Sequence, residues 1–237
     1  KRMNQYSAKF IAISNAVRED WIDFGLDENK VEVIYDGIDP DNYRCKKSAH
    51  NEDKKLKLVM CGAIYEGKGQ LDLVKALDPL VDQGMEIYLD IYGNSANDRY
   101  FGSICDYIAS HNLVNHIAIK GHVDNINEIL RQYDAGVVCS KAEGFGLVTI
   151  EYMISGLSVI ASNTGANPEI LQDGRYGRLY PLGNLDLLRR IIAETYGEKE
   201  KKSLANNDQI EYAKENFSIE KTVRKLADLY TSVIGDK

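Results

Sequence analysis

Short apolar runs that end in glycine or serine alternate with helical runs along most of this 237-residue chain. Strand-like runs at residues 56–61, 85–92, 117–120 and 135–139 are followed directly by Gly62, Gly93, Gly121 and Ser140. Repeated strand–helix alternation is typical of a parallel, doubly wound α/β sheet of the Rossmann type. Ligands of such sheets bind outside the carboxyl ends of the strands, so we expect these four ends to line one crevice.

The same alternation extends toward both ends of the chain. Further strands are predicted at residues 10–14, 31–35 and 157–161. Further helices are predicted at residues 15–24, 70–83, 98–111, 127–132, 147–155, 186–195 and 219–234. Asn15 is the predicted N-cap of the first helix, and Pro168 is expected to open a brief extra one.

One apolar stripe runs along the last predicted helix, formed by Ile219, Val223, Leu226, Tyr230 and Val233. We expect this helix to return toward a domain that precedes the chain. In the absence of that domain the stripe should be partly exposed and should favour self-association.

A long polar stretch at residues 36–55, which contains Pro40, is typical of a linker. Residues 1–45 are therefore expected to be the tail of a preceding domain plus a hinge, and residues 46–237 a ligand-binding domain. The chain begins with Lys1 and reaches a strand-like run by residue 10, so we expect it to be a fragment of a longer protein.

The composition indicates which cellular compartment and which class of binding partner to expect. The formal net charge is −7 and no long basic run occurs, which argues against a nucleic acid partner. Cys45, Cys61, Cys105 and Cys139 are too widely spaced for a metal knuckle or redox pair, so a reducing cytoplasm is expected. No signal peptide and no apolar stretch near 18 residues is found, and peripheral membrane attachment stays open.

Residues 143–151 read EGFGLVTIE and carry the strongest functional signal. Gly144 and Gly146 permit a sharp turn and close approach of a ligand, and the helix that follows presents unpaired N–H groups that suit a phosphate. Glu143 and Glu151 bracket this turn and accept hydrogen bonds strongly from hydroxyl donors. Phosphate in the middle and hydroxyls at both ends describe a nucleotide sugar, although such turns also serve packing alone in many α/β proteins.

With these residues in place, the chain resembles the donor-binding, C-terminal half of a GT-B glycosyltransferase of the large retaining family 4. The resemblance covers nearly the whole chain and rests on residues 33–39, 68–69, 121–123, 140–151, 156–160, 167–169 and 173–174. It implies hexosyl transfer with retention from a UDP-, GDP- or ADP-sugar, without a metal or other cofactor. The acceptor, a glycan or lipid-linked sugar, would bind the preceding domain, in the cytoplasm or peripherally at the inner face of the membrane.

The resemblance also implies roles for individual residues. The catalytic pair would be Glu143, which hydrogen-bonds hydroxyls of the donor sugar, and Lys68, which neutralises the diphosphate. Glu151 would hold the ribose hydroxyls, and His122 and Val123 would lie near the base. The implied donor-binding set is Gly62, Ala63, Lys68, Gly93, His122, Val123, Glu143, Gly144, Phe145, Gly146, Leu147 and Glu151. Of these, Phe145, Gly146 and Leu147 would contribute backbone N–H groups toward the diphosphate or sugar.

One departure from the family pattern concerns charge. The family usually has an arginine directly after the glycine that ends the first donor-domain strand, whereas Ala63 follows Gly62 here. Lys141 and Arg99 are candidates for the missing cation. The absent arginine is also the only support for an alternative function, a catalytically inactive sugar-nucleotide sensor or assembly subunit.

Three further interpretations have less support in the sequence. An NAD-dependent oxidoreductase needs G-x-G-x-x-G after its first strand, and glycines at 62, 67 and 69 have the wrong spacing. A GT-B sugar-nucleotide epimerase would not be expected to show the glutamate pair. Asp39 and Asp41 have a spacing used by metal-dependent transferases of another fold, but their linker position favours a turn. Glu169, after Pro168, is expected to support its helix start.

Overall fold

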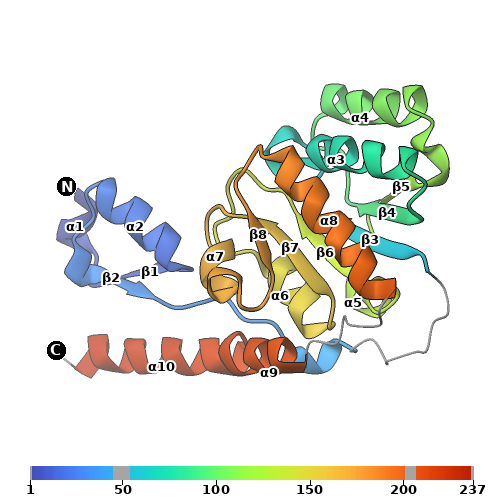
Figure 1. Ribbon diagram of the computed structural model, residues 1–237. Helices are drawn as coiled ribbons and strands as arrows, with labels where there is room; N and C mark the ends of the chain where they lie inside the picture. Colours follow the sequence, from blue (N-terminus) through green and yellow to red (C-terminus); the bar gives the residue numbers. More distant parts are fainter. Residues whose placement is uncertain (1, 45–53, 201–206, 236–237) are drawn as a thin grey trace.

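A computed structural model describes residues 2–44, 54–200 and 207–235, and within them a six-stranded parallel sheet forms the centre of the molecule (Figure 1). In spatial order its strands are β5 (Ile117–Gly121), β4 (Ile87–Tyr92), β3 (Leu56–Cys61), β6 (Ala135–Val138), β7 (Ser158–Ser162) and β8 (Arg178–Tyr180). Every neighbouring pair is parallel, so all six carboxyl ends lie at one edge. The chain order reverses between β3 and β6, which confirms the predicted doubly wound, Rossmann-like α/β fold.

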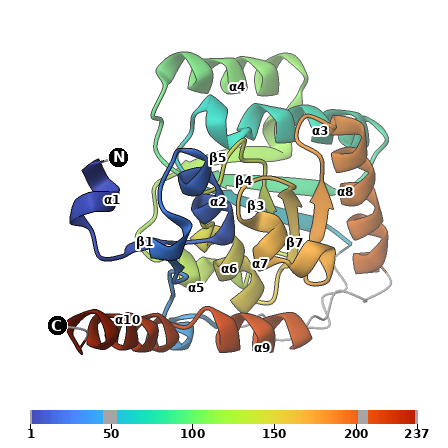
Figure 2. The same ribbon diagram turned by 90° about the vertical axis from the view of Figure 1, so that its left-hand side faces the viewer.

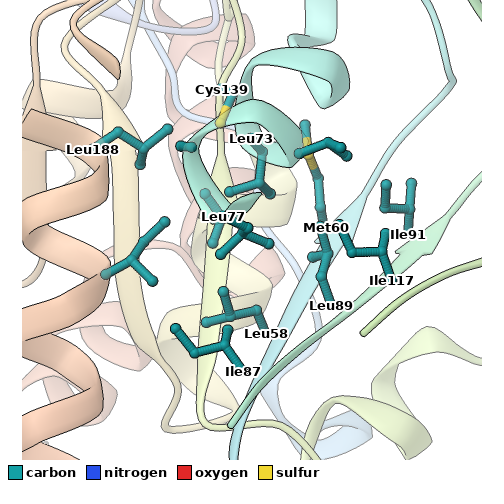
Figure 3. Close-up of a cluster of buried hydrophobic side chains, with 14 of the residues drawn as sticks. Leu58, Met60, Leu73, Leu77, Ile87, Leu89, Ile91, Ile117, Cys139 and Leu188 are labelled. Atoms are coloured by element: carbon teal, nitrogen blue, oxygen red, sulfur yellow. The ribbon is translucent and has the colours of Figure 1, made fainter. Parts of the chain in front are cut away.

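Helices cover both faces of this sheet, and each face has its own apolar core. One face packs against α3 (Gln70–Asp82), α4 (Asp98–Ser110) and α8 (Leu185–Glu200). The other packs against α5 (Ile126–Leu130), α6 (Leu147–Ile154), α7 (Asn167–Ile170) and α9 (Asn207–Asn216). In the first core, Leu58 of β3 and Leu77 of α3 belong to the same buried cluster (Figure 3). Val59 belongs to the second core, so β3 is buried on both faces like other central parallel strands.

Residues 2–33 form a small unit beside the sheet domain (Figures 1 and 2). It contains α1 (Arg2–Tyr6), β1 (Phe10–Ala12), α2 (Asn15–Asp23), a 3₁₀ turn η1 (Glu28–Lys30) and β2 (Val31–Val33), with β1 and β2 paired in parallel. The following residues return along the junction between α9 and α10 (Ile219–Gly235). Ile38 N–H donates to the Phe217 carbonyl at 3.0 Å, and Ile219 N–H donates to the Ile38 carbonyl at 2.9 Å.

Helix α10 (Ile219–Gly235) extends from that junction toward the small unit, so both chain ends lie on the same side of the molecule (Figures 1 and 2). Its apolar stripe is partly exposed, as expected, because Ile219, Val223 and Tyr230 are exposed while Leu226 and Val233 are half-buried. Self-association through the stripe stays a prediction. In the described parts of the chain, no helix combines the length and apolar composition needed to cross a bilayer.

Several sequence expectations about elements were wrong. Ser14 is the N-cap of α2, with its Oγ accepting from Val17 N–H at 3.1 Å, so Asn15 is instead the first helical residue. Helix α1, strand β8 and helix α9 were not predicted, and α8 extends five residues beyond the predicted end at 195. The remaining predicted strands and helices are present, with ends that shift by up to two residues.

Residues 36–44 of the predicted linker contain one 3₁₀ turn but neither an α-helix nor a strand. Asp39 accepts from Asp41 N–H at 3.0 Å and caps a 3₁₀ turn, η2 (Pro40–Asn42), so the aspartate pair forms a turn as expected. The proposed division near residue 45, and Cys45 itself, lie outside the described residues. The division into two domains therefore stays a prediction.

The backbones at the ends of β3 and β4 lie so close together that a small added side chain should destabilise the fold. Gly93 has φ 146°, and a Cβ at that position would overlap the carbonyl group of Gly62 on the neighbouring strand. Gly102 lies inside α4, and a Cβ there would have open space. We expect Gly93→Ala to lower the free energy of unfolding by about 2 kcal/mol or more, because backbone must shift.

The matched control is Gly102→Ala, which should raise the free energy of unfolding by about 0.5–1 kcal/mol through helix propensity. Urea unfolding followed by circular dichroism measures both variants. Equal effects of the two substitutions would contradict the close approach of β3 and β4.

Candidate functional site

The carboxyl ends of β5, β4 and β3 lie next to one another, as the sequence predicted. Gly93 N–H donates to the Gly121 carbonyl at 2.9 Å, and Gly62 N–H donates to the Tyr92 carbonyl at 2.9 Å. Strand β6 pairs with β3 on the other side, which adds Ser140 to the same edge. The structure thus confirms that the four strand ends share one edge of the sheet.

Lys68 and Glu143 meet at this edge. Lys68 ends η3 (Glu66–Lys68), the 3₁₀ turn after β3, while Glu143 lies in the loop after β6. Lys68 Nζ lies 2.7 Å from Glu143 Oε2, with the two side chains 25% and 17% exposed. A Cβ added to Gly62 would lie 3.8 Å from Lys68 Cε, so the lysine side chain runs past the end of β3. The two residues assigned to catalysis from sequence therefore form a partly buried ion pair.

Hydrogen bonds from the end of β7 and the loop that follows it hold the turn that carries Glu143. Ala166 N–H donates to the Glu143 carbonyl at 3.0 Å. The hydroxyls of Ser162 and Thr164 both donate to the Ser140 carbonyl at 2.7 Å. These bonds fix the backbone on both sides of residues 141–142, and so fix the point from which the Glu143 side chain projects.

Gly146 turns the chain into α6. It is the N-cap of that helix with φ 94°, a conformation that favours glycine. The N–H groups at the start of an α-helix have no partner within the helix, so the first turn of α6 offers donors beside Glu143. The Leu147 side chain is exposed at this start. The Phe145 side chain is buried and stacks on Tyr35 with ring centroids 5.6 Å apart, so only its backbone is available to a ligand.

Glu151 lies one turn further along α6, also near the end of β3. Its half-buried carboxylate interacts electrostatically with Cys61, the last residue of that strand. Burial raises the pKa of Glu151, and a hydrogen bond from Tyr43 partly opposes the shift. The Tyr43 hydroxyl donates to Glu151 Oε1 at 2.8 Å. Sequence reasoning missed Tyr43, because nothing in a polar linker indicates a partner 108 positions away.

The remaining predicted donor-site residues lie along the same edge. His122 and Val123 follow Gly121 at the end of β5, with His122 exposed and its Nε2 3.2 Å from Asp124 Oδ1. Ala63 is exposed, and its carbonyl accepts from Gln70 Nε2 at 2.9 Å. Their contacts with a base or a diphosphate stay predictions.

Of the two candidates for a replacement cation, Lys141 is bonded through its backbone to the residue before Lys68. Its N–H donates to the Gly67 carbonyl at 2.8 Å, and the residue is exposed. Arg99 is exposed in the first turn of α4, beyond the end of β4. No described interaction assigns either side chain to the site.

The start of α2 in the small unit docks against this loop cluster. Ser14 Oγ donates to the Gly144 carbonyl at 2.6 Å, inside the GFG turn itself. The Glu169 carboxylate accepts from the Asn15 backbone at 3.0 Å and from Asn15 Nδ2 at 2.6 Å. Glu169 is therefore structural, as expected, but it caps α2 rather than supporting only its own helix. Sequence spacing did not indicate this contact.

Within residues 2–44, 54–200 and 207–235, no group of three or more His, Cys, Asp and Glu side chains is arranged to hold a metal ion. The sequence prediction of metal-independent chemistry stays untested by this observation. What the described site offers is a cation, a helix start and two carboxylates. Such a set suits an anion flanked by neutral hydroxyl donors.

Comparison with protein families identifies the chain's relatives. Residues 43–216 match the family Glycosyl transferases group 1, and residues 1–42 match Glycosyltransferase Family 4. Over 189 residues the chain is 29% identical to the phosphatidyl-myo-inositol mannosyltransferase of Mycobacterium tuberculosis, covering 78% of this chain and 48% of that protein. The chain spans about half the length of the curated relatives it matches.

Solved structures share the fold over essentially the whole chain. A glycosyltransferase from Rickettsia africae superposes with a TM-score of 0.88 at 23% identity, covering 100% of this chain and 67% of that one. Anabaena Alr3699/HepE, solved in complex with UDP and glucose, gives 0.87 at 22% identity, covering 97% and 64%. At this identity the likeness establishes the fold.

The ion pair at the centre of the site can be measured without any ligand. We expect Lys68→Met and Glu143→Gln each to lower the free energy of unfolding. Their double-mutant cycle should show a coupling of about 1 kcal/mol, because the pair is only partly exposed to water. Chemical unfolding of the four proteins gives this value. Lys214 on α9 supplies the control, since the effects of Lys214→Met and Glu143→Gln on the free energy of unfolding should be additive. Zero coupling between Lys68→Met and Glu143→Gln would contradict the geometry.

Proposed function

The chain belongs to the glycosyl transferases group 1 family, and we propose that it is the donor-binding half of a glycosyltransferase that uses a nucleoside-diphosphate sugar. The observation that carries the proposal is the meeting of Lys68 and Glu143, 2.7 Å apart, beside the start of α6. These groups suit a diphosphate, with sugar hydroxyls at Glu143 and ribose hydroxyls at Glu151. Anabaena Alr3699/HepE, a structural neighbour, was solved with UDP-glucose, which supports the same class of ligand.

The proposed chemistry assigns a step to each group. As the bond between the sugar C1 and the diphosphate oxygen breaks, the departing nucleoside diphosphate gains negative charge. Lys68 and the N–H groups that open α6 stabilise that charge without reorganising. The sugar acquires oxocarbenium character, and Glu143 holds its hydroxyls while the acceptor oxygen forms the new bond at C1 and the acceptor's hydroxyl proton passes to the departing diphosphate oxygen. Glu151 contributes by fixing the ribose.

The finer parts of the proposal come from family resemblance. We propose transfer of a hexose with retention of configuration, without a metal, to a glycan or lipid-linked sugar. A mannosyltransferase among the relatives supports a hexose. The acceptor site is assigned to the part of the relatives that this chain does not span, so the isolated chain should bind nucleotide weakly without turnover. A cytoplasmic location with peripheral membrane association of the whole protein belongs to the same proposal.

Nucleotide binding is the direct test. We expect UDP, GDP or ADP at millimolar concentration to raise the melting temperature, because a ligand of the folded state stabilises it by mass action. Lys68→Met should weaken binding about tenfold or more through loss of a charge-assisted contact. Lys214→Met, which removes a lysine on α9 instead, should leave binding unchanged. The proposal fails if none of the three nucleotides binds the unsubstituted chain.

Restoring the usual family cation tests the position of the diphosphate. Ala63 is exposed next to Gly62, so an arginine fits there without displacing a core residue. We expect Ala63→Arg to raise affinity for the nucleoside diphosphate about 3- to 10-fold, since a guanidinium binds phosphate through two parallel hydrogen bonds. Affinity for the corresponding nucleoside should not change. Ala63→Gln adds a long side chain without charge, and an equal gain in nucleotide affinity from it would argue against a diphosphate at this edge. Calorimetric titration measures the affinity of all three proteins.

A further inference from the structure

Tyr43 is held firmly at the point where the linker meets the sheet domain. It follows the 3₁₀ turn η2, and its N–H donates to the Pro40 carbonyl at 3.1 Å. The residue before it is fixed twice: Asn42 Nδ2 donates to Asp39 Oδ2 at 3.1 Å, and the Asn42 carbonyl accepts from Asn127 Nδ2 at 2.7 Å. The Tyr43 ring packs against the second apolar core. Its hydroxyl therefore reaches Glu151 from a rigid base.

The geometry at Glu151 leaves part of the carboxylate available. Tyr43 occupies one acceptor position of Oε1, and this carboxylate accepts no other hydrogen bond from the described residues. An ionised carboxylate has about four acceptor positions, so Oε2 and one position on Oε1 remain. Two acceptor positions on adjacent oxygens match the two neighbouring hydroxyls of a ribose. A donor such as the tyrosine hydroxyl adds no charge, so Glu151 keeps its capacity to accept.

We propose that Tyr43 is a positioning residue, which fixes the Glu151 carboxylate so that its free acceptor positions receive the ribose 2′- and 3′-hydroxyls of the bound nucleotide. This inference rests on the proposed function, because it requires a nucleotide at this edge. It adds a residue from the linker, outside the EGFGLVTIE segment, to the determinants of ligand specificity. Tyr43 acts through Glu151 and does not itself touch the nucleotide.

The titration of Glu151 provides a signature of this role. Its pKa is raised by burial, and the Tyr43 bond works against that rise. The other groups that interact with it are Cys61 from β3, whose pKa burial raises to about 12, and Tyr152 from α6, whose pKa burial also raises. Burial likewise raises the pKa of Tyr43 itself. None of these three groups changes charge between pH 5 and 9, so their titration does not obscure that of Glu151 in this range.

The sign of the pH effect follows from these directions. Only the ionised carboxylate accepts hydrogen bonds from both ribose hydroxyls, so binding through Glu151 is lost as the pH falls through its pKa. Removing the Tyr43 hydroxyl removes an influence that lowers this pKa. The loss of binding should therefore begin at a higher pH in a Tyr43→Phe variant. A purely structural role for Tyr43 would weaken binding without moving the pH profile.

The experiment compares Tyr43→Phe with the unsubstituted chain in calorimetric titrations between pH 5 and 8.5. The ligands are whichever of UDP, GDP and ADP binds, and its 2′,3′-dideoxy counterpart. At pH 7.5 we expect affinity for the ribonucleotide to fall about 3- to 10-fold, the usual effect of one hydrogen bond. Affinity for the dideoxynucleotide should stay within about twofold, and the midpoint of the ribonucleotide pH profile should move upward.

Two further variants make the result specific. Tyr107→Phe removes another tyrosine hydroxyl bonded to a carboxylate, that of Asp78 at 2.8 Å in the α3–α4 layer, and should leave binding unchanged. Glu151→Gln should bind the ribonucleotide weakly, and adding Tyr43→Phe to it should have no further effect. Any pH dependence of ribonucleotide affinity that persists in Glu151→Gln comes from other groups. It is subtracted from the pH profiles of the unsubstituted chain and of Tyr43→Phe.

Each outcome decides the inference. It is overturned if Tyr43→Phe binds the ribonucleotide as well as the unsubstituted chain does, while the proposed function stands because nucleotide binding itself is intact. Equal weakening toward both ligands, with an unchanged pH midpoint, would assign Tyr43 a structural role and also overturn it. Failure of the unsubstituted chain to bind any of the three nucleotides removes the proposed function and this inference together.

Discussion

The close packing of two loops at the carboxyl edge of the sheet determines where the chemistry of this molecule can lie. The Glu143 carbonyl accepts from Ala166 N–H at 3.0 Å, and a Cβ on the neighbouring Gly165 would overlap the Glu143 backbone. The loop after β7 thus fixes the loop after β6. From that fixed backbone the Glu143 side chain reaches Lys68, and Gly146 starts α6 in the direction that brings Glu151 to the end of β3. A rigid backbone of this kind is what a preorganised site requires.

Much of this architecture is visible in the sequence because burial imposes periodicity on it. Strands buried on both faces appear as predominantly apolar runs, and the glycines that follow mark where neighbouring backbones crowd together. Two of the elements that were missed, β8 and α9, lack those signals. Strand β8 spans three residues and begins with Arg178, whose guanidinium reaches Glu198 on α8 while its backbone pairs with β7. Helix α9 buries only Gln209, Ile210 and Ala213, too few apolar positions for a recognisable stripe.

The site shows the same division between local and long-range information. The sequence placed Glu143, the GFG turn and Glu151 on one strand–turn–helix unit, because their spacing is local. Three side-chain contacts could not be read from it, since they join residues 75, 108 and 154 positions apart: Lys68 with Glu143, Tyr43 with Glu151, and Asn15 with Glu169. Each depends on how loops from different strands fold over one edge. Periodicity carries no information about that arrangement.

The two carboxylates at this edge differ in how their negative charge is compensated. Glu143 lies against the ammonium group of Lys68, whereas Glu151 receives, from the residues that the structure describes, only the neutral hydroxyl of Tyr43 and keeps its full negative charge when ionised. A diphosphate is attracted toward the lysine and repelled from Glu151, while neutral hydroxyls are favoured at Glu151. In the proposed binding mode the diphosphate therefore lies on the lysine side, with the ribose toward Glu151 and the donor sugar toward Glu143.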